Sequence, residues 1–124
     1  MAYNQDNIFA KILRGEIPCK KVYENQDVLA FYDINPQAKV HILVIPKQPY
    51  QSWDDFSAHA TPHQMAALMQ AVGLIARQLG LDKQGYRVLA NNGQNAHQEV
   101  PHFHLHLLGG HPLGPILQKA IPTS

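Results

Sequence analysis

The chain has 124 residues, of which 45% are hydrophobic and 15% are charged, with 10 lysines and arginines against 9 aspartates and glutamates. We expect a single domain over residues 1–124 that folds around a hydrophobic core. The balanced charge argues against a nucleic-acid partner, and no stretch approaches the roughly 20 apolar residues that span a membrane. Cys19 is the only cysteine, so an internal disulfide is excluded and a cytoplasmic location is expected.

The N-terminal part of the chain predicts a short helix followed by a β-hairpin. Apolar residues of segment 6–15 recur three and four positions apart, Asp6 can cap a helix there, and Gly15 can end it. Segments 21–25 and 27–34 are rich in β-branched and aromatic residues and meet at turn-forming residues. This pattern is typical of two strands joined by a tight turn.

The middle of the chain predicts a buried strand and a long helix. Residues 41–47 are almost continuously apolar, as in a strand that is covered on both faces. Thr61 can then cap a helix over 62–79, with Gln64 completing a capping box and Gly80 following as its stop. The expected buried face of this helix consists of Met65, Leu68, Met69, Val72, Ile75, Ala76 and Leu79.

Two further strands are expected at 86–92 and 101–108, joined by the polar loop 93–100. The resulting order of helix, three strands, long helix and two strands indicates an α+β domain with an antiparallel sheet and the helices on one side. A parallel sheet is the alternative, but too few helices alternate with the strands.

Three histidines alternate with hydrophobic residues in the last of these strands: His102, His104 and His106. Side chains two apart in a strand share one face about 6.6–7 Å from each other, so the three imidazoles should face one cleft. The opposite face should pack under the long helix through Phe103, Leu105 and Leu107. An isolated histidine is usually a surface or core residue without a catalytic role. We interpret three histidines in this way: His59, His63 and His111. Three imidazoles on one face repel one another when protonated, and when neutral they stabilise a core less than apolar side chains would. The three histidines together therefore indicate a functional site.

Two kinds of chemistry use such a cluster. Neutral imidazoles are common zinc ligands, and histidines two apart on a strand can reach one ion. Alternatively, one imidazole attacks an electrophile such as phosphorus while its neighbours orient it and bind the developing charge. A structural zinc site would normally recruit cysteines, but the spacing alone leaves a catalytic metal and a nucleophilic histidine both open.

Resemblance to a known family carries the interpretation further. The stretch "HFHLHLL" is similar to the His-x-His-x-His-x-x motif of the histidine triad (HIT) superfamily. Residues 6–47, 86–93 and 98–110 resemble its nucleotide-binding branch in the same order, and the tail 107–117 is closer to the bacterial-type members. The resemblance implies a five-stranded antiparallel sheet with one long and one short helix, extended across a homodimer, and neither a metal nor a cofactor.

The resemblance also implies a mechanism. His104, the middle histidine, would attack an α-phosphorus and form a covalent nucleotidyl-histidine that water then hydrolyses. His102 and His106 would hold the nucleophile and stabilise charge, and His41 matches a fourth active-site histidine.

The nucleoside end of the implied site begins with Asp33 and Ile34, which match family residues that bind the ribose hydroxyls and line the base pocket. Without the family, Asp33 would be read as a turn or capping carboxylate. An apolar purine slot is expected from residues that would otherwise be assigned to the core: Phe9, Ile12 and Phe31. The phosphate is expected to meet polar loop residues: Asn91, His97, Gln98 and Glu99. Many relatives have a glycine and a small hydroxyl residue around this glutamine, and Glu99 would repel a phosphate unless it turns away or takes up a proton.

We therefore expect a purine nucleoside phosphoramidase or nucleotidyl hydrolase, which cleaves the P–N bond between a nucleoside 5′-monophosphate and an amine. Its expected partners are a purine nucleoside monophosphate or its phosphoramidate and a second copy of the chain. The alternatives are a dinucleoside polyphosphate hydrolase, a nucleotide-binding regulator without catalysis, and a zinc-dependent hydrolase.

Overall fold

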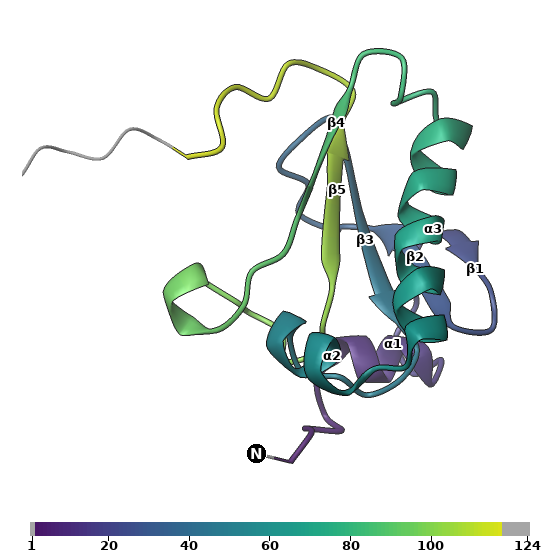
Figure 1. Ribbon diagram of the computed structural model, residues 1–124, viewed down its shortest axis with the longest axis vertical. Coiled ribbons are helices and arrows are strands. Elements are labelled where there is room, and N and C mark those ends of the chain that lie inside the picture. The colour runs from purple at the N-terminus through teal and green to yellow at the C-terminus, as the bar shows by residue number, and fades with distance from the viewer. Residues whose placement is uncertain (1, 118–124) are drawn as a thin grey trace, which may run out of the picture.

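The structure is a computed structural model that describes residues 2–117 and contains, in this range, one five-stranded antiparallel sheet (Figure 1). Its strands are β1 (Lys21–Glu24), β2 (Val28–Tyr32), β3 (Val40–Pro46), β4 (Tyr86–Leu89) and β5 (Leu105–Gly109). They lie in the order β1-β2-β3-β5-β4. The helices are α1 (Ile8–Leu13), α2 (Trp53–His59) and α3 (Pro62–Gln78), and a short 3-10 helix, η1, covers Gln94–Ala96. The prediction of an α+β domain with an antiparallel sheet is confirmed.

The long helix α3 begins and ends where the sequence predicts. The Thr61 hydroxyl accepts a hydrogen bond from the Gln64 N–H, and the Gln64 side chain accepts one from the Thr61 N–H, which completes the capping box. Gly80 follows with φ 74°, a left-handed conformation that favours glycine. Met69 and Leu79 differ from the prediction, because they are 66% and 41% exposed instead of facing the core.

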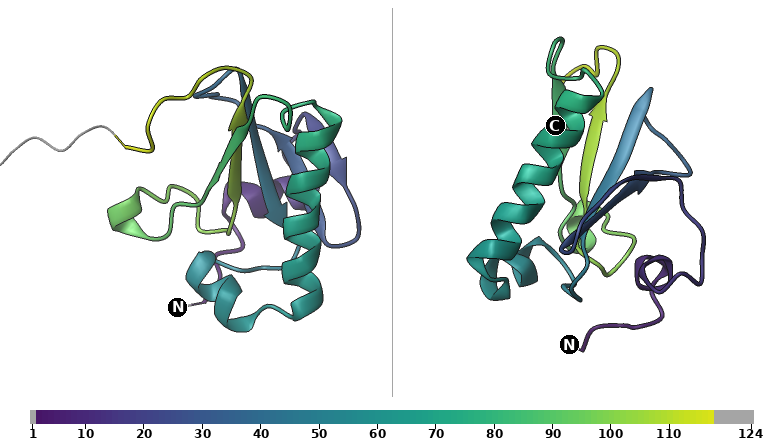
Figure 2. Two further views of the ribbon diagram at one scale, coloured as in Figure 1. Left: turned by 45° about the horizontal axis from the view of Figure 1, so that its top comes forward. Right: turned by 90° about the vertical axis from the view of Figure 1, so that its right-hand side faces the viewer.

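Each face of the sheet carries its own hydrophobic cluster, because successive side chains of a strand point in opposite directions. On one face, Ile42 of β3 packs with Phe56 of α2 and Ile75 of α3. On the other face, Leu43 of β3 packs with Phe9 of α1. The expectation that the helices share one side is therefore wrong for α1, and Figure 2 (right) shows α1 and α3 on opposite sides of the sheet.

The strand β5 begins at Leu105, four residues later than the predicted start. The backbone before it finds partners outside the sheet: the Phe103 N–H donates to the Tyr50 carbonyl (2.8 Å), and the His102 carbonyl accepts from the His104 side chain (2.7 Å). The prediction for the hydrophobic residues of this segment is confirmed, since the cluster under α3 includes Phe103, Leu105 and Leu107.

The short helices differ more from the prediction than α3 does. Helix α1 is capped by Asn7 rather than Asp6, because the Asn7 Oδ1 accepts the Ala10 N–H at 2.9 Å. Helix α2 was not predicted, although Ser52 caps it. Within residues 2–117, none of the helices has both the length and the apolar character needed to cross a bilayer.

Candidate active site

The predicted site residues gather around a pocket of about 570 Å³ on the α1 side of the sheet. Residues of α1, the turn between β2 and β3, strand β5 and the loop before it contribute to its walls. All of the predicted site residues line this pocket except His102 and Gln98. The pocket is also lined by residues that were not predicted, Cys19, Leu43 and Val100, because apolar residues in or beside a strand look like ordinary core.

Among residues 2–117, one ring nitrogen of His104 has a hydrogen-bond partner and the other has none. Its Nδ1–H donates to the His102 carbonyl at 2.7 Å, so the neutral ring has its lone pair on Nε2. The Phe9 ring stands edge-on to it, with 5.0 Å between ring centroids. Burial lowers the pKa of His104, partly offset by the hydrogen bond to the carbonyl and by the charges of Asp33 and Glu99. The ring is therefore neutral near pH 7 and offers an electron pair on Nε2, which a nucleophile requires.

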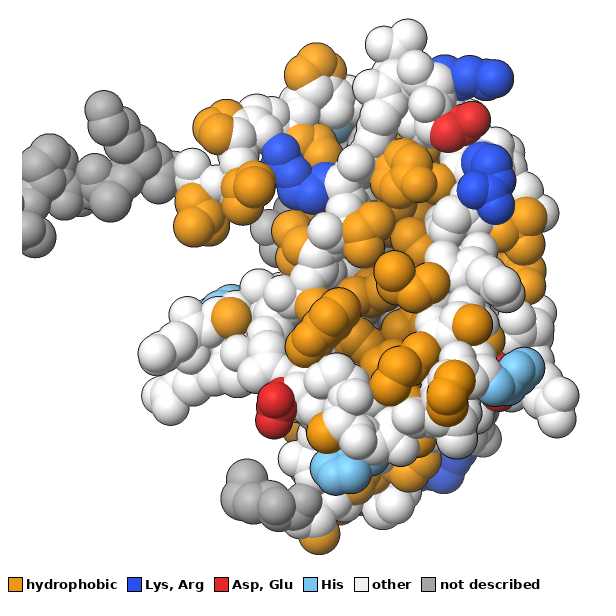
Figure 3. All heavy atoms as spheres, viewed as in Figure 1, with side chains coloured by type: hydrophobic (Ala, Val, Ile, Leu, Met, Phe, Trp, Pro, Cys, Tyr) orange, Lys and Arg blue, Asp and Glu red, His pale blue; other side chains and the backbone are white. Residues whose placement is uncertain are grey.

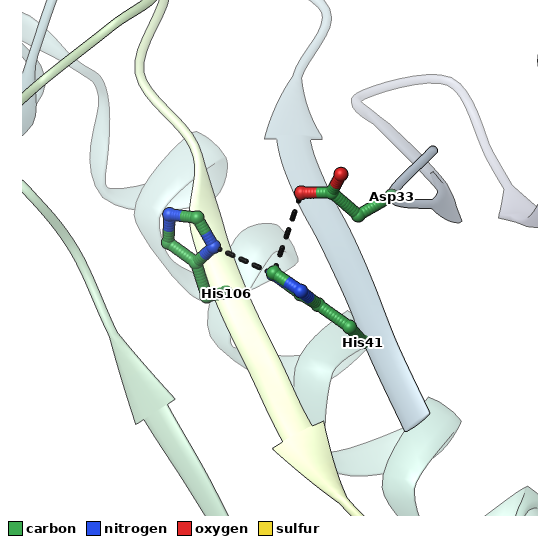
Figure 4. Close-up of side chains that lie close together, drawn as sticks. All are labelled: Asp33, His41 and His106. Carbon is green, nitrogen blue, oxygen red and sulfur yellow. Dashed lines mark hydrogen bonds and ion pairs between the residues drawn. The ribbon is translucent and has the colours of Figure 1, made fainter. Parts of the chain in front are cut away.

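His41 and His106 form a hydrogen-bonded pair beside Asp33 (Figure 4). The His41 Nδ1 accepts the Gln37 N–H at 3.0 Å, so the neutral His41 ring keeps its proton on Nε2. That nitrogen donates to the His106 Nδ1 at 2.9 Å and lies 3.5 Å from the Asp33 Oδ2. The neutral His106 ring consequently carries its own proton on Nε2. Burial lowers the pKa of both rings, that of His106 to about 4 with a contribution from the neighbouring histidines.

His102 is fully buried and supports the site from behind. Its Nε2–H donates to the Pro46 carbonyl at 2.8 Å, and its Nδ1 accepts a hydrogen bond from the Tyr3 hydroxyl. Burial lowers the pKa of His102 to about 4. Because both ring nitrogens are occupied, its direct contribution to the pocket is the carbonyl that holds His104. Tyr3 was not predicted as part of the site, since nothing in the sequence marks a contact between residues 99 positions apart.

Asp33 combines a turn with a place in the pocket. Its Oδ1 accepts the Asn35 N–H at 2.8 Å, as the turn interpretation requires, while its Oδ2 faces His41. A carboxylate has about four lone-pair sites, so acceptors remain for a ligand. Ile34, the next residue, is 85% exposed at the edge of the same pocket.

Gln98 has a structural role that differs from the expected one. Its Oε1 accepts the Gly93 N–H at 2.9 Å, and its Nε2 donates to the carbonyls of Gln51 (2.7 Å) and Val100 (2.9 Å). The amide is thus used by the backbone of the loop before β5 and does not face a phosphate. The side chain fixes the shape of this loop.

His97 and Glu99 stand together in the wall of the pocket. His97 has φ 60°, a left-handed conformation that is uncommon for residues other than glycine. Its Nε2 lies 2.9 Å from the Glu99 Oε1. Both side chains are largely exposed, so the Glu99 carboxylate turns toward His97 without leaving solvent. Asn91 lines the same pocket from the end of β4.

The zinc interpretation required the three triad histidines to converge, and they do not, because both ring nitrogens of His102 bond elsewhere. A different trio, Asp33, His41 and His106, has ligand atoms within 4.8 Å of one another (Figure 4). A metal ion there would need the lone pair of the His41 Nε2, which carries a proton because Nδ1 accepts the Gln37 N–H. The donor set therefore fits a chain of neutral hydrogen-bonded rings better than a metal centre.

Comparison with known proteins matches most of the chain to one domain family. The sequence model of the HIT domain matches residues 14–113. The chain is 57% identical over 117 residues to an uncharacterized HIT-like protein of Azospirillum brasilense, covering 94% of this chain and 96% of that one. It is 44% identical over 115 residues to the purine nucleoside phosphoramidase of Escherichia coli, covering 91% and 94%.

Solved structures show the same fold. A histidine triad protein from Clostridium difficile superposes with a TM-score of 0.82 at 41% identity, covering 94% of this chain and 100% of that one. A HIT family hydrolase from Legionella pneumophila superposes with a TM-score of 0.81 at 39% identity, covering 86% and 95%.

Proposed function

The chain belongs to the HIT domain family, and we propose that it is a hydrolase that cleaves the P–N bond of purine nucleoside phosphoramidates. The name of the Escherichia coli relative supports this substrate class. The observation that carries the proposal is the environment of His104, a buried neutral imidazole whose Nδ1 is anchored to a carbonyl. Its Nε2 is then the nucleophile.

The reaction proceeds in two steps. The His104 Nε2 attacks the α-phosphorus, an N–P bond to the ring forms, and the bond to the amine breaks as the leaving nitrogen takes up a proton from solvent. Water then attacks the same phosphorus, loses a proton to solvent, and releases the nucleoside monophosphate and the free imidazole. The His106 Nε2–H donates to the phosphoryl oxygens, and the His102 carbonyl stabilises the positive charge that develops on the His104 ring.

The nucleoside occupies the other end of the pocket. The volume of about 570 Å³ lies in the range of ordinary ligand sites, roughly 300–1,000 Å³. Asp33 accepts hydrogen bonds from the ribose hydroxyls through the lone pairs that the Asn35 turn leaves available. The purine lies among the apolar lining residues Phe9, Ile12, Phe31 and Ile34.

We also propose that the active form is a homodimer. Strand β4 lies at the edge of the sheet, and its residues Tyr86 and Val88 are 39% and 43% exposed. Trp53 of α2 and Met69 of α3 are 50% and 66% exposed. Figure 3 shows hydrophobic side chains gathered in the middle of the face on which α3 and β4 lie. A second copy of the chain would cover these side chains and the unpaired edge.

A cytoplasmic location fits the half-buried free thiol of Cys19.

The decisive experiment is turnover of an adenosine 5′-phosphoramidate whose amine becomes fluorescent on release. His104→Ala should abolish turnover, and His106→Ala should slow it by roughly 10²–10³ through lost charge stabilisation. His63→Ala is the matched control, because His63 is exposed on α3 and lies outside the pocket. It should keep the turnover of the unmodified protein.

Rapid quenching and mass spectrometry test the covalent step. An acid-labile nucleotidyl adduct should appear on the peptide 100–110 of the unmodified protein and be absent from His104→Ala. EDTA should change neither result. Loss of activity on chelation, together with one zinc ion per chain, would contradict the nucleophile and make the histidines ligands.

A further inference from the structure

A second hollow of about 670 Å³ adjoins the nucleotide pocket. It lies between the loop before β5 and the start of α2, where its walls include Gln51, Ser52 and Asn92. Two residues line both this hollow and the nucleotide pocket, namely His97 and Glu99. The two cavities therefore meet at this pair.

The charge around this junction is one-sided. Neither cavity is lined by a lysine or an arginine within the described residues, whereas two carboxylates, Asp33 and Glu99, line the nucleotide pocket together with His104. Of the two, Glu99 also lines the second hollow and Asp33 does not, and the charges of both act on His104. An anion entering the second hollow finds a carboxylate and no fixed cation, while a cation finds a partner.

The direction of the reaction places the leaving group near Glu99. In an in-line displacement the leaving nitrogen departs on the side of phosphorus opposite to the His104 Nε2, and the nucleoside extends toward Asp33. The end of the cavity system that remains for the amine is the junction at Glu99 and the hollow behind it. His97, at 2.9 Å, holds the Glu99 carboxylate at this junction.

We propose that the second hollow is the subsite for the leaving amine and that Glu99 selects amines with a second, positively charged group beyond the scissile nitrogen. The inference rests on the proposed phosphoramidase function and specifies the substrate class for it. It also separates that function from dinucleoside polyphosphate hydrolysis, because a polyphosphate leaving group would bring negative charge to Glu99.

The test compares three adenosine 5′-phosphoramidates of equal chain length, made with 1,4-diaminobutane (cationic), butylamine (neutral) and 4-aminobutyrate (anionic). The ratio of their kcat/KM values removes any effect of Glu99 on the nucleoside or phosphate, which the three substrates share. The cationic substrate should exceed the neutral one by about two- to fivefold, as for an exposed ion pair, and the anionic one should fall below it. The preference should shrink as salt is added.

Three variants assign the preference to Glu99. Glu99→Gln should bring the three kcat/KM values together. Asn92→Asp adds a carboxylate to the same hollow and keeps the acceptor for the Asp54 N–H, so it should widen the cationic-to-anionic ratio. Glu24→Gln removes a carboxylate on β1 that lines neither cavity, and it should leave the ratio as in the unmodified protein.

The outcomes separate the two proposals. Equal kcat/KM values in the unmodified protein, or a preference that survives Glu99→Gln, would overturn the amine subsite and leave the phosphoramidase intact. If none of the three substrates is turned over, the phosphoramidase itself fails, and the subsite fails with it.

Discussion

Acidification from pH 7 to pH 5 should destabilise the protein through His102, because this ring is buried in its neutral form. Burial lowers its pKa in the folded state from 6.5 to about 4. Between these values the unfolded chain binds more protons than the folded chain, so the free energy of unfolding falls as the pH falls. The contribution of His102 is fully present above pH 6.5 and is lost on the way to pH 4.

The size of the effect follows from the two pKa values. At pH 5 the unfolded imidazole is almost fully protonated and the folded one almost fully neutral, which amounts to about 2 kcal/mol at about 1.4 kcal/mol per pH unit. Solvent does not screen the His102 ring, because the residue is 0% exposed. The pH window also lies above the titration of ordinary carboxyl groups in the unfolded chain, near pH 4.

Urea unfolding at pH 7 and pH 5 measures this contribution. His102→Asn should reduce the difference in unfolding free energy between the two pH values by about 2 kcal/mol relative to the unmodified protein. Comparing differences removes the general destabilisation that the substitution causes at both pH values. The pKa values of three further histidines, His41, His104 and His106, are lowered in the same way, and these residues remain in the variant, so part of the pH dependence should persist. An equal difference in both proteins would refute a buried neutral His102.

Two further substitutions test the nucleoside contact and the assembly. Asp33→Asn should raise KM about fivefold, because an amide oxygen is a weaker acceptor for ribose hydroxyls than a carboxylate. Equal KM values for ribose and 2′-deoxyribose substrates in the unmodified protein would contradict this contact. Light scattering at micromolar concentration should give twice the mass of one chain, and Val88→Lys on β4 should give a monomer by placing a charge at the exposed edge. A monomeric unmodified protein would count against the homodimer.

Local signals in the sequence were sufficient for the elements that local interactions define. The capping box of Thr61 and Gln64 fixes the start of α3 with two hydrogen bonds between residues three apart. Hydrophobic residues at every second position correctly predicted that Phe103 and Leu105 lie in the core. The prediction holds even where the segment is outside the strand, because side chains alternate between two faces in any extended chain. Helix α2 was not predicted because it has a single buried residue, Phe56, and one residue cannot show a helical hydrophobic period.

Features that depend on distant segments were not readable from the sequence. The position of α1 on the opposite face of the sheet from α3 is decided by which strand residues Phe9 packs against. The helical period of Met69 predicts a buried side chain, whereas this side chain is exposed in the single chain. The proposed dimer would cover it. The observed roles of His102 and Gln98 differ from the predicted ones because each side chain donates a hydrogen bond to a backbone carbonyl far away in the sequence. His102 donates to the Pro46 carbonyl, and Gln98 donates to the Gln51 carbonyl.

The opposite tasks proposed for His104 and His106 follow from the backbone rather than from the residue type. The His102 carbonyl can only accept, so it forces the His104 proton onto Nδ1 and leaves Nε2 as a nucleophile. The Gln37 N–H can only donate, so it forces the His41 proton onto Nε2, and that proton in turn fixes the His106 proton on its outer nitrogen. Two identical side chains two residues apart thus present a lone pair and an N–H to the same pocket. Three histidines on one strand face reveal a site, but only the neighbouring backbone groups decide which ring attacks and which ring donates.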